Sequence, residues 1–308
     1  IVVKTDITNA YGSVHRAAIF DAVKRSCGVG TAEFTKWFLN LHLSHPSRYL
    51  AEGQEVATYS RGVAQGGPMS MALFCRTIHQ ALKDTQQFII ENHNRNGLVL
   101  ALADDTTFIG PPDVAFQAVD LFTDHIGAIG LSLNPAKSST LCVNPAIFEK
   151  TEQLAFEHKF PKPTQCLPIL GSFVGLINNE KQAILDSMNK DVFRRLKAID
   201  NPQIELLLLR HSIITSSTFM TRTMPPEVLE VPLSHLRDHV RDALAHILGL
   251  QSISDLVLAI ASLSLSTGGL GLTDLFTVRH SAYYASVIHA IKTWSIWLDD
   301  RSEERRVG

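Results

Sequence analysis

The strongest indication of the fold is one short segment of this chain, Leu100-Ala101-Leu102-Ala103-Asp104-Asp105-Thr106-Thr107-Phe108-Ile109-Gly110. Its two apolar runs flank an acidic pair and end at Gly110-Pro111-Pro112, which is typical of two strands joined by a tight turn. Adjacent carboxylates resist burial unless a cation compensates their charge. A hairpin whose tip binds Mg²⁺ resolves this conflict, because carboxylate oxygens suit that ion. The alternative is a solvated turn, in which Asp is also common.

A third acidic residue stands at the end of another predicted strand. Residues 1–7 form a β-rich run that contains Asp6, and a helix is expected over residues 17–23. Asp6 can therefore lie at the edge of a sheet, beside the hairpin that carries Asp104 and Asp105. Acids in this arrangement can bridge two metal ions that polarise an attacking hydroxyl and stabilise a leaving pyrophosphate.

Length and composition describe a foldable chain with one large or two ordinary domains. The 308 residues are 45% hydrophobic and 19% charged, and a formal net charge of −2 gives no bulk sign of nucleic-acid binding. Basic residues still cluster locally, at Lys190, Arg194, Arg195, Lys197, Arg210 and Arg222. For this cluster, a solvated helix face and a contact to backbone phosphates both remain open.

Cysteine, histidine and hydropathy patterns exclude several classes of site. Four scattered cysteines (Cys27, Cys75, Cys142 and Cys166) show no C-x-x-C spacing and predict reduced thiols in an intracellular protein. His235 and His239 can share a helix face, but no third ligand completes a metal site. No signal peptide or apolar run long enough to span a bilayer occurs, so we expect no membrane partner. We expect an intracellular location, in the nucleus if the host is eukaryotic.

The periodicity of apolar residues divides the chain near residue 176. The first part mixes strands with helices and contains a glycine-rich loop, residues 61–70, that leads into a long helix over residues 71–92. The second part carries helical periods over residues 182–199, 203–223, 236–248 and 277–298. Residues 301–308 form a charge block without a core-facing period, and we expect a disordered or artefactual tail there. The chain begins inside a strand, which is typical of a fragment.

Five motifs, taken in order, resemble the reverse transcriptase domain of non-LTR (LINE-type) retroelements. They are Asp6-Ile7-Thr8-Asn9-Ala10-Tyr11-Gly12-Ser13-Val14, Gln65-Gly66-Gly67-Pro68-Met69-Ser70, Leu102-Ala103-Asp104-Asp105, Gly130-Leu131-Ser132-Leu133-Asn134-Pro135-Ala136-Lys137 and Leu170-Gly171. Two weaker matches follow, Arg222-Thr223-Met224-Pro225-Pro226 and Gly268-Gly269-Leu270-Gly271-Leu272. Three positions depart from the family pattern: Leu102 replaces an aromatic residue, Gly67 replaces Asp, and Gly12 replaces Asp or Asn.

The resemblance implies an α+β fold of the right-hand polymerase type. Residues 1–175 are then the palm, an antiparallel sheet with packed helices, and residues 176–300 are an α-helical thumb or connection region. The family's fingers precede the first motif, so the resemblance also implies an N-terminally truncated domain without fingers. The implied activity is that of an RNA-directed DNA polymerase, a nucleotidyltransferase that adds dNTPs to a DNA primer 3′-hydroxyl along an RNA template.

The resemblance also assigns catalytic and metal-binding roles. Asp6 and Asp104 bridge two Mg²⁺ ions, with Mn²⁺ as the alternative metal, while Asp105 and the carbonyl of Ile7 supply further oxygens. Lys137 approaches the triphosphate and donates a proton to pyrophosphate or offsets its charge. A solvated surface lysine is the alternative interpretation of Lys137.

Substrate contacts follow from the same motifs. Tyr11 lies under the sugar of the incoming nucleotide and excludes a 2′-hydroxyl by its bulk, the alternative being a core aromatic residue. The residues expected to contact the templating pair and template backbone are Gln65, Gly66 and Ser70, and the primer-grip turn is Leu170 with Gly171. Backbone contacts to the primer–template duplex are expected from Arg194, Arg195 and Arg210.

Three other interpretations compete with this one. The first is an inactive retroelement remnant that folds, or binds nucleic acid, without polymerising. The second places the same palm in another host, such as a group II intron maturase or a telomerase subunit. The third is an unrelated helical interaction scaffold, which leaves the ordered acidic residues unexplained. The sequence does not decide the oligomeric state.

Overall fold

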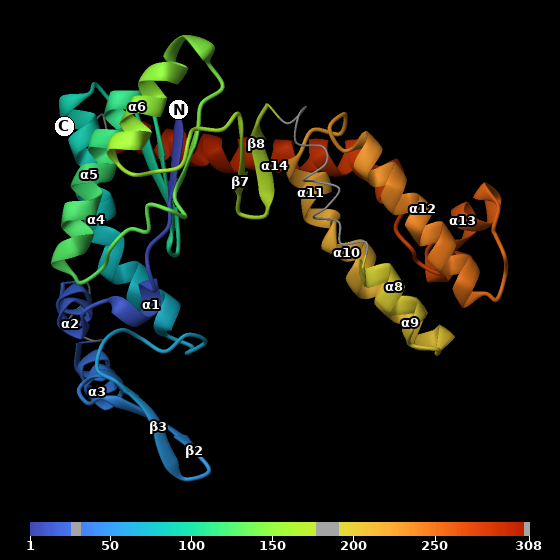
Figure 1. The fold of residues 1–308 in the computed structure, drawn as a ribbon, viewed down its shortest axis with the longest axis horizontal. Coiled ribbons are helices and arrows are strands. Elements are labelled where there is room, and N and C mark those ends of the chain that lie inside the picture. The colour runs from blue at the N-terminus through green and yellow to red at the C-terminus, as the bar shows by residue number, and fades with distance from the viewer. Residues whose placement is uncertain (26–31, 177–190, 305–308) are drawn as a thin grey trace. The chain divides into compact units, whose positions relative to one another are not determined.

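The computed structural model describes residues 1–25, 32–176 and 191–304, and it divides into two compact units (Figure 1). The first unit is Ile1–Leu167 and the second is Pro168–Gly308. Cys27, Lys190 and residues 182–190 of one predicted helix lie outside the described residues, as does the end of the predicted tail, residues 305–308.

A four-stranded antiparallel sheet forms the centre of the first unit. Its strands are β1 (Val2–Thr5), β4 (Leu98–Leu102), β5 (Asp105–Ile109) and β6 (Ser139–Leu141), in the order β4-β5-β1-β6. The N-terminal strand is therefore inserted between β5 and β6, and it pairs with both. The predicted hairpin is formed by β4 and β5, with Leu102 opposite Asp105.

Helices cover one face of this sheet. The long helix α4 (Ser70–Asn92) packs on α5 (Pro112–Ala128) and on β4, and α5 also contacts β1 and β5. The short α1 (Ala10–Ser13) and α2 (Arg16–Lys24) pack against α4. The predicted helix over residues 71–92 is confirmed within one residue, whereas α1 was not predicted, because four residues are too few to show a helical period.

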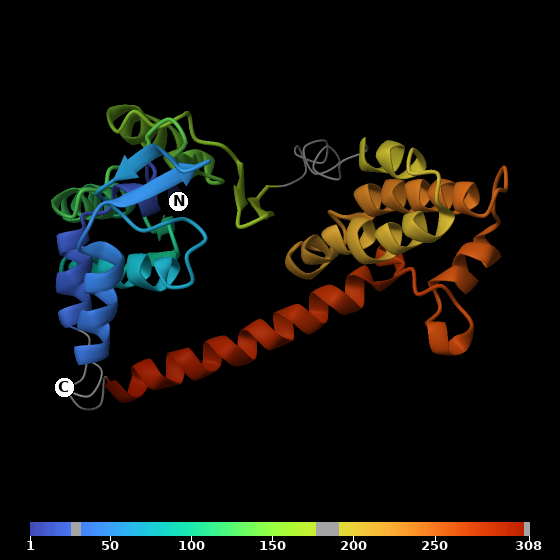
Figure 2. The same cartoon turned by 90° about the horizontal axis from the view of Figure 1, so that it is seen from below.

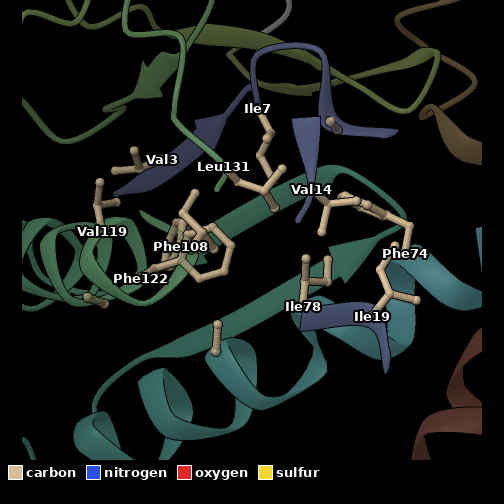
Figure 3. Close-up of a cluster of buried hydrophobic side chains, with 14 of the residues drawn as sticks. Val3, Ile7, Val14, Ile19, Phe74, Ile78, Phe108, Val119, Phe122 and Leu131 are labelled. Atoms are coloured by element: carbon tan, nitrogen blue, oxygen red, sulfur yellow. The ribbon is translucent and has the colours of Figure 1, made fainter. Parts of the chain in front are cut away.

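The core lies between the sheet and these helices (Figure 3). Strand alternation produces it: Val3 and Phe108 are fully buried on the covered face, while Lys4 and Thr107 are half-buried on the other. The ring of Phe108 meets that of Phe122 from α5 edge-on, at 5.5 Å between centroids. Full burial of each such aromatic side chain stabilises the fold by roughly 2–3 kcal/mol, so the sheet and α5 are fixed to each other.

The first unit contains further elements outside this layer. They are α3 (Ala32–Leu43), β2 (Ser47–Ala51), β3 (Gln54–Tyr59), the 3₁₀ turn η1 (Pro145–Ile147) and α6 (Phe148–Glu157). β2 and β3 form a hairpin at the turn Glu52-Gly53, a turn-forming pair in the sequence, where both residues have positive φ, 52° and 77°. This conformation is that of a type I′ turn, which suits the twist of paired strands. The two units divide within β7 (Cys166–Ile169), which pairs with β8 (Ser172–Gly175).

Beyond β8, the described part of the second unit is helical. Its elements are α8 (Asp191–Lys197), α9 (Pro202–Leu208), the π-helical turn η3 (Leu209–Ile213), α10 (Ile214–Ser216), α11 (Thr218–Thr223), α12 (Glu230–Ile247), α13 (Asp255–Ser262), the 3₁₀ turn η4 (Leu265–Thr267) and α14 (Leu275–Glu304). α14 is the long red helix in Figure 2, and it packs on α11 and α12. Residues 301–304 of the predicted tail are its last turn. None of the helices within the described ranges is long and apolar enough to cross a membrane.

One predicted helix of the second unit is broken. Residues 203–223 carry a continuous apolar period, but the chain forms α9, a π-helical turn, α10 and α11 in succession. Buried Ser217 separates the end of α10 at Ser216 from the start of α11 at Thr218. The period of apolar residues depends on which positions face the core. A local change from α-helix to π-helix leaves this period visible, so the sequence does not show the break.

Candidate active site

The tip of the β4–β5 hairpin presents two acidic residues. Only Ala103 and Asp104 separate the paired residues Leu102 and Asp105, and Ala103 takes a positive φ of 56° to close this tight turn. Asp104 therefore lies at the tip and Asp105 begins β5. Leu102, at the position where the family pattern has an aromatic residue, is 55% exposed, so no core contact depends on it.

Asp6 reaches the same corner of the sheet from β1. The last residue pair of β1 and β5 is Thr5 with Thr106. If this register is continued by one residue, Asp6 comes opposite Asp105 on strands about 4.8 Å apart. Asp6 thus directly follows the paired end of β1, and Asp105 directly precedes the paired residue Thr106, while the approach of their side chains stays a prediction. We call Asp6, Asp104 and Asp105 together the acidic corner.

The segment 130–138 is hydrogen-bonded to the chain at Asp6. The Asn134 N–H donates to the Asp6 carbonyl at 2.7 Å, and the Asp6 N–H donates to Ser138 Oγ at 3.2 Å. Lys137 lies between these two partners in the sequence and is exposed. Its predicted role at the triphosphate stays a prediction.

The Ile7 carbonyl accepts neither of the backbone hydrogen bonds that join residues 6–8 to residues 132–134. Ile7 forms an antiparallel bridge with Leu133, in which the Thr8 N–H donates to the Ser132 carbonyl at 2.9 Å. The other bond of the bridge is the one from Asn134 to Asp6. Neither bond uses the Ile7 carbonyl, so this oxygen suits the role of a metal ligand that the motif predicts.

A hollow of about 380 Å³ opens at the hairpin tip. Its lining comes from three motifs that are far apart in the sequence, and consists of Tyr11, Gln65, Gly66, Gly67, Ser70, Met71 and Asp104. Five of these residues are predicted catalytic or substrate-binding residues. The order of motifs along the chain therefore predicted residues that the fold brings to one place.

Tyr11 is both a lining residue and part of the core. Its ring packs against that of Phe74 at 4.8 Å between centroids, which fixes its orientation. Burial raises the pKa of the Tyr11 hydroxyl, and the nearby Asp104 carboxylate and Cys75 thiol raise it further. Tyr11 and Asp104 line the same hollow. Tyr11 thus packs against the core as well as lining the hollow, and its contact with a nucleotide sugar stays a prediction.

Gly62 attaches the glycine-rich loop to the first motif, a contact that sequence reasoning missed. The Gly62 N–H donates to the Val14 carbonyl and the Val63 N–H to the Tyr11 carbonyl, each at 2.8 Å. Gly62 has a φ of +64°, and a Cβ on it would lie 2.2 Å from the Tyr11 oxygen. Only glycine allows this approach. Its presence before Gln65-Gly66 is the signal that was available in the sequence.

Arg16 is a second residue that sequence reasoning missed. Its buried guanidinium donates to the carbonyls of Gly62 (3.2 Å), Leu43 (3.2 Å) and His45 (2.6 Å), and to Ser47 Oγ at 3.1 Å. These bonds join α2 to the loop that carries Gln65 and to the start of β2. An arginine at a helix start reads as a surface residue in the sequence, so no pattern reveals this role.

Two departures from the family pattern have a steric explanation. A Cβ on Gly12 would lie 2.7 Å from Asn9 Nδ2, because the Asn9 side chain occupies the space next to this position. A Cβ on Gly67 would lie 2.5 Å from Ser70 Oγ in the same way. In both places a nearby polar side chain fills the volume that the family residue would need.

The two carboxylates at the tip have different surroundings. Asp104 lines the hollow, whereas Asp105 Oδ1 lies 3.4 Å from Lys4 Nζ. Within residues 1–25, 32–176 and 191–304, no three His, Cys, Asp or Glu side chains are grouped so as to hold a metal ion. The oxygens of Asp6, Asp104 and Ile7 still suit Mg²⁺, which needs only one or two protein carboxylates besides water and substrate phosphate. Convergence of these groups on two ions stays a prediction.

The predicted primer-grip turn belongs to the second unit. Leu170 and Gly171 connect β7 to β8 with positive φ values of 50° and 80°, the conformation of a type I′ turn. Leu170 is exposed, and a Cβ on Gly171 would touch the ring of Phe219 at 3.8 Å. The turn is thus confirmed as a turn, and its contact with a primer stays a prediction.

The three predicted backbone-binding arginines differ among themselves. Arg194 and Arg195 are exposed on α8, and both pair with Asp191, at 2.8 and 3.3 Å. Arg210 is half-buried, and a Cβ on Gly271 would lie 3.0 Å from its Nε, so it packs against the turn at Gly271.

The histidines of α12 were weighed as metal ligands in the sequence. His239 stacks on Phe193 at 5.2 Å between ring centroids, which gives it a packing role.

Sequence comparison identifies relatives of this chain. A family model described as "Reverse transcriptase (RNA-dependent DNA polymerase)" matches residues 1–174. The chain is also 25% identical over 222 residues to the "Retrovirus-related Pol polyprotein from type-1 retrotransposable element R2" of Bradysia coprophila, an alignment that covers 68% of this chain and 25% of the relative. The chain therefore spans about a quarter of the length of that relative. These findings confirm the resemblance to non-LTR reverse transcriptases.

Structural comparison gives more distant similarities. The structure of apo telomerase from Candida tropicalis is 14% identical, with 85% of this chain and 44% of that chain covered and a TM-score of 0.43. Telomerase from the same organism with a fragment of telomeric RNA is 11% identical, with 91% and 49% covered and a TM-score of 0.42. At these scores the similarity carries no argument about this chain.

Proposed function

Because this chain belongs to the reverse transcriptase (RNA-dependent DNA polymerase) family, we propose that its first unit is the palm of an RNA-directed DNA polymerase. It would transfer nucleotides from dNTPs to a DNA primer 3′-hydroxyl, along an RNA template. One observation carries this proposal. The hollow at the hairpin tip gathers Tyr11, Gln65, Gly66, Ser70 and Asp104 from three separate motifs, next to the end of the strand that leads to Asp6.

In this proposal the acidic corner holds two Mg²⁺ ions, with Mn²⁺ as a substitute. Asp6 and Asp104 would hold the ions, with Asp105 and the Ile7 carbonyl as further oxygen ligands. The ions would supply charge stabilisation at the attacking 3′-hydroxyl and at the leaving pyrophosphate. The protein's part is to fix the position of these oxygens on a sheet whose other face is packed against α4 and α5.

The hollow would hold the incoming nucleotide against the template. Tyr11 is immobilised by Phe74, so its ring cannot move aside for a 2′-hydroxyl, and deoxynucleotides are preferred by steric exclusion. Gln65, Gly66 and Ser70 belong to the second motif and line the same hollow, where they would contact the templating pair. Lys137, on the segment bonded to Asp6, offsets the charge of the triphosphate.

The second unit would serve as the thumb or connection region. In this role the Leu170-Gly171 turn approaches the primer, and Arg194, Arg195 and Arg210 approach the phosphates of the primer–template duplex. Exposed ion pairs such as those of Asp191 with Arg194 and Arg195 are worth about 0–1 kcal/mol, so phosphates can replace the carboxylate.

Primer extension by the 308-residue chain tests this proposal. The reaction contains an RNA template, an annealed DNA primer, dNTPs and Mg²⁺. Asp104→Asn is expected to lower the extension rate by about 10³-fold or more, since it removes a charge that faces the reacting groups. Asp124→Asn, an exposed carboxylate on α5, serves as the matched control and should extend primers at the unsubstituted rate.

Two results would contradict the proposal. Extension by Asp104→Asn at the unsubstituted rate would refute the assignment of the acidic corner. Binding of primer–template by the unsubstituted chain without any extension would instead identify a remnant that holds nucleic acid but does not polymerise.

A further inference from the structure

Lys4 places a positive charge beside the acidic corner, and no motif predicts it. Its Nζ lies 3.4 Å from Asp105 Oδ1. Lys4 pairs with Thr107 in the sheet, so Asp105, two residues before Thr107, is its diagonal neighbour on the same face. This is the face that α4 and α5 leave open, because Val3, Thr5, Thr106 and Phe108 point to the covered side.

Asp6 shares this open face with Lys4. Thr5 and Ile7 are buried on the covered side, so the alternation of β1 places half-buried Asp6 on the side of Lys4. The Lys4 ammonium therefore pairs with the Asp105 carboxylate diagonally across, and Asp6 follows two residues further along on the same face. Lys4 is less exposed than its partner, with 24% of its side chain accessible against 42% for Asp105.

We propose that Lys4 is the built-in counter-ion of the acidic corner, a positioning residue that holds Asp105 on the open face and competes there with divalent cations. The inference rests on the proposed function, because it concerns the same metal-binding acids. An ammonium paired with Asp105, on the face that also carries Asp6, lowers the local negative potential, which weakens binding of a second cation at these oxygens.

Competition of this kind has a consequence for the order of binding. With Lys4 in place, the free chain binds a divalent cation weakly, and the cation is retained when the substrate triphosphate adds its own oxygens. Mg²⁺ is usually bound in this manner, by few protein carboxylates and by substrate phosphates. A Lys4 that only stabilised the sheet would leave the affinity for metal unchanged when it is replaced.

Titration of the full chain with Mn²⁺, followed by electron paramagnetic resonance without nucleotide or nucleic acid, tests the inference. Lys4→Met keeps the length of the side chain and removes its charge, and it should bind Mn²⁺ about fivefold more tightly, the upper effect of one exposed ion pair. Lys4→Arg keeps the charge and should bind like the unsubstituted chain. Lys162→Met breaks a pair of similar type with Glu152, at 2.9 Å, away from the corner, and should also leave the affinity unchanged.

A second variant gives an independent measure if Lys4→Met fails to fold. Asp105→Asn should weaken Mn²⁺ binding by about twofold or less, because the Asp105 carboxylate is already paired with Lys4. Asp6→Asn should weaken it by about tenfold or more. Equal losses in the two Asp variants would overturn the inference. Unchanged or weaker binding in Lys4→Met would overturn it as well.

The same titration separates this inference from the proposed function. If Asp6→Asn binds Mn²⁺ as the unsubstituted chain does, the metal assignment within the proposed function fails. If Asp6→Asn loses binding while Lys4→Met equals the unsubstituted chain, only the role of Lys4 fails. The absence of saturable binding in both the unsubstituted chain and Lys4→Met would overturn both.

Discussion

The acidic corner of the first unit and the basic helix α8 of the second are both predicted to contact substrate, and their surroundings differ. Asp6, Asp104 and Asp105 come from distant segments that sheet register brings together, and Asp104 faces a hollow lined by other motifs. Arg194 and Arg195 are close in sequence, and both pair with a carboxylate of their own helix. Order of motifs across elements is thus a stronger indication of a site than clustering of charge within one element.

The largest expected effect is the difference in primer-extension rate between a substitution in the acidic corner and a substitution in α8. Asp6→Asn should lower primer extension by about 10³-fold or more, because it removes the acid that bridges both ions in the proposed mechanism. The double variant Arg194→Gln/Arg195→Gln should change the single-turnover rate by about threefold or less, since contacts to duplex phosphates affect binding of the primer–template and not the chemical step. Single-turnover extension at low salt measures both, and equal losses would remove the distinction between the regions.

The next effect concerns the stability of the first unit. Arg16→Met leaves three carbonyls and a hydroxyl without their buried charged donor, which should lower the free energy of unfolding by about 3–5 kcal/mol. Arg194→Met, on exposed α8, should lower it by about 0.5 kcal/mol or less. Urea unfolding followed by circular dichroism compares the two. A loss below 1 kcal/mol for Arg16→Met would show that its bonds do not hold the loop.

Gly62 and Gly53 both have positive φ, but only Gly62 lies close to another part of the backbone. Alanine substitutions at the two positions therefore distinguish the cost of the backbone conformation from the cost of a steric clash. Gly62→Ala should cost about 2–4 kcal/mol, because its Cβ would lie 2.2 Å from the Tyr11 oxygen at a φ of +64°. Gly53→Ala has a φ of +77° but nothing within 4 Å of its Cβ, so it should cost only about 1 kcal/mol. Thermal unfolding gives both values. Similar costs would mean that the loop does not depend on contact with the first motif.

The smallest effect concerns the exchange of side chains between positions 9 and 12. Gly12→Asn alone should destabilise the first unit by about 1 kcal/mol, because its Cβ meets the Asn9 side chain at 2.7 Å. The double variant Asn9→Gly/Gly12→Asn should recover this loss, since Gly suits the left-handed φ of 44° at position 9 and frees the space. Recovery is read from the melting temperature, and additive losses would contradict the steric explanation.

Much of the first unit could be predicted from its sequence. The β4–β5 hairpin, α4 and the Glu52-Gly53 turn follow from apolar period and turn chemistry, and the grouping of Tyr11, Gln65 and Asp104 is implied by the resemblance of the ordered motifs to the family. These signals are local, or they are ordered along the chain. They need no knowledge of which strand lies next to which.

The remaining contacts depend on register and on packing between distant segments. The Lys4–Asp105 pair exists because β1 and β5 align Lys4 with Thr107, and no spacing in the sequence reveals that alignment. The bonds of Arg16 require α2, β2 and the glycine-rich loop to meet at one point. The break of the predicted helix 203–223 at η3 likewise leaves the apolar period intact and is invisible to it.

Anomalous diffraction from crystals of the chain grown with Mn²⁺, dNTP and a primer–template duplex tests the central claim most directly. The account predicts manganese bound by oxygens of Asp6 and Asp104, beside Tyr11, with Lys4 displaced from Asp105. Manganese located at other residues, with Asp6 turned away from the hairpin tip, would contradict it.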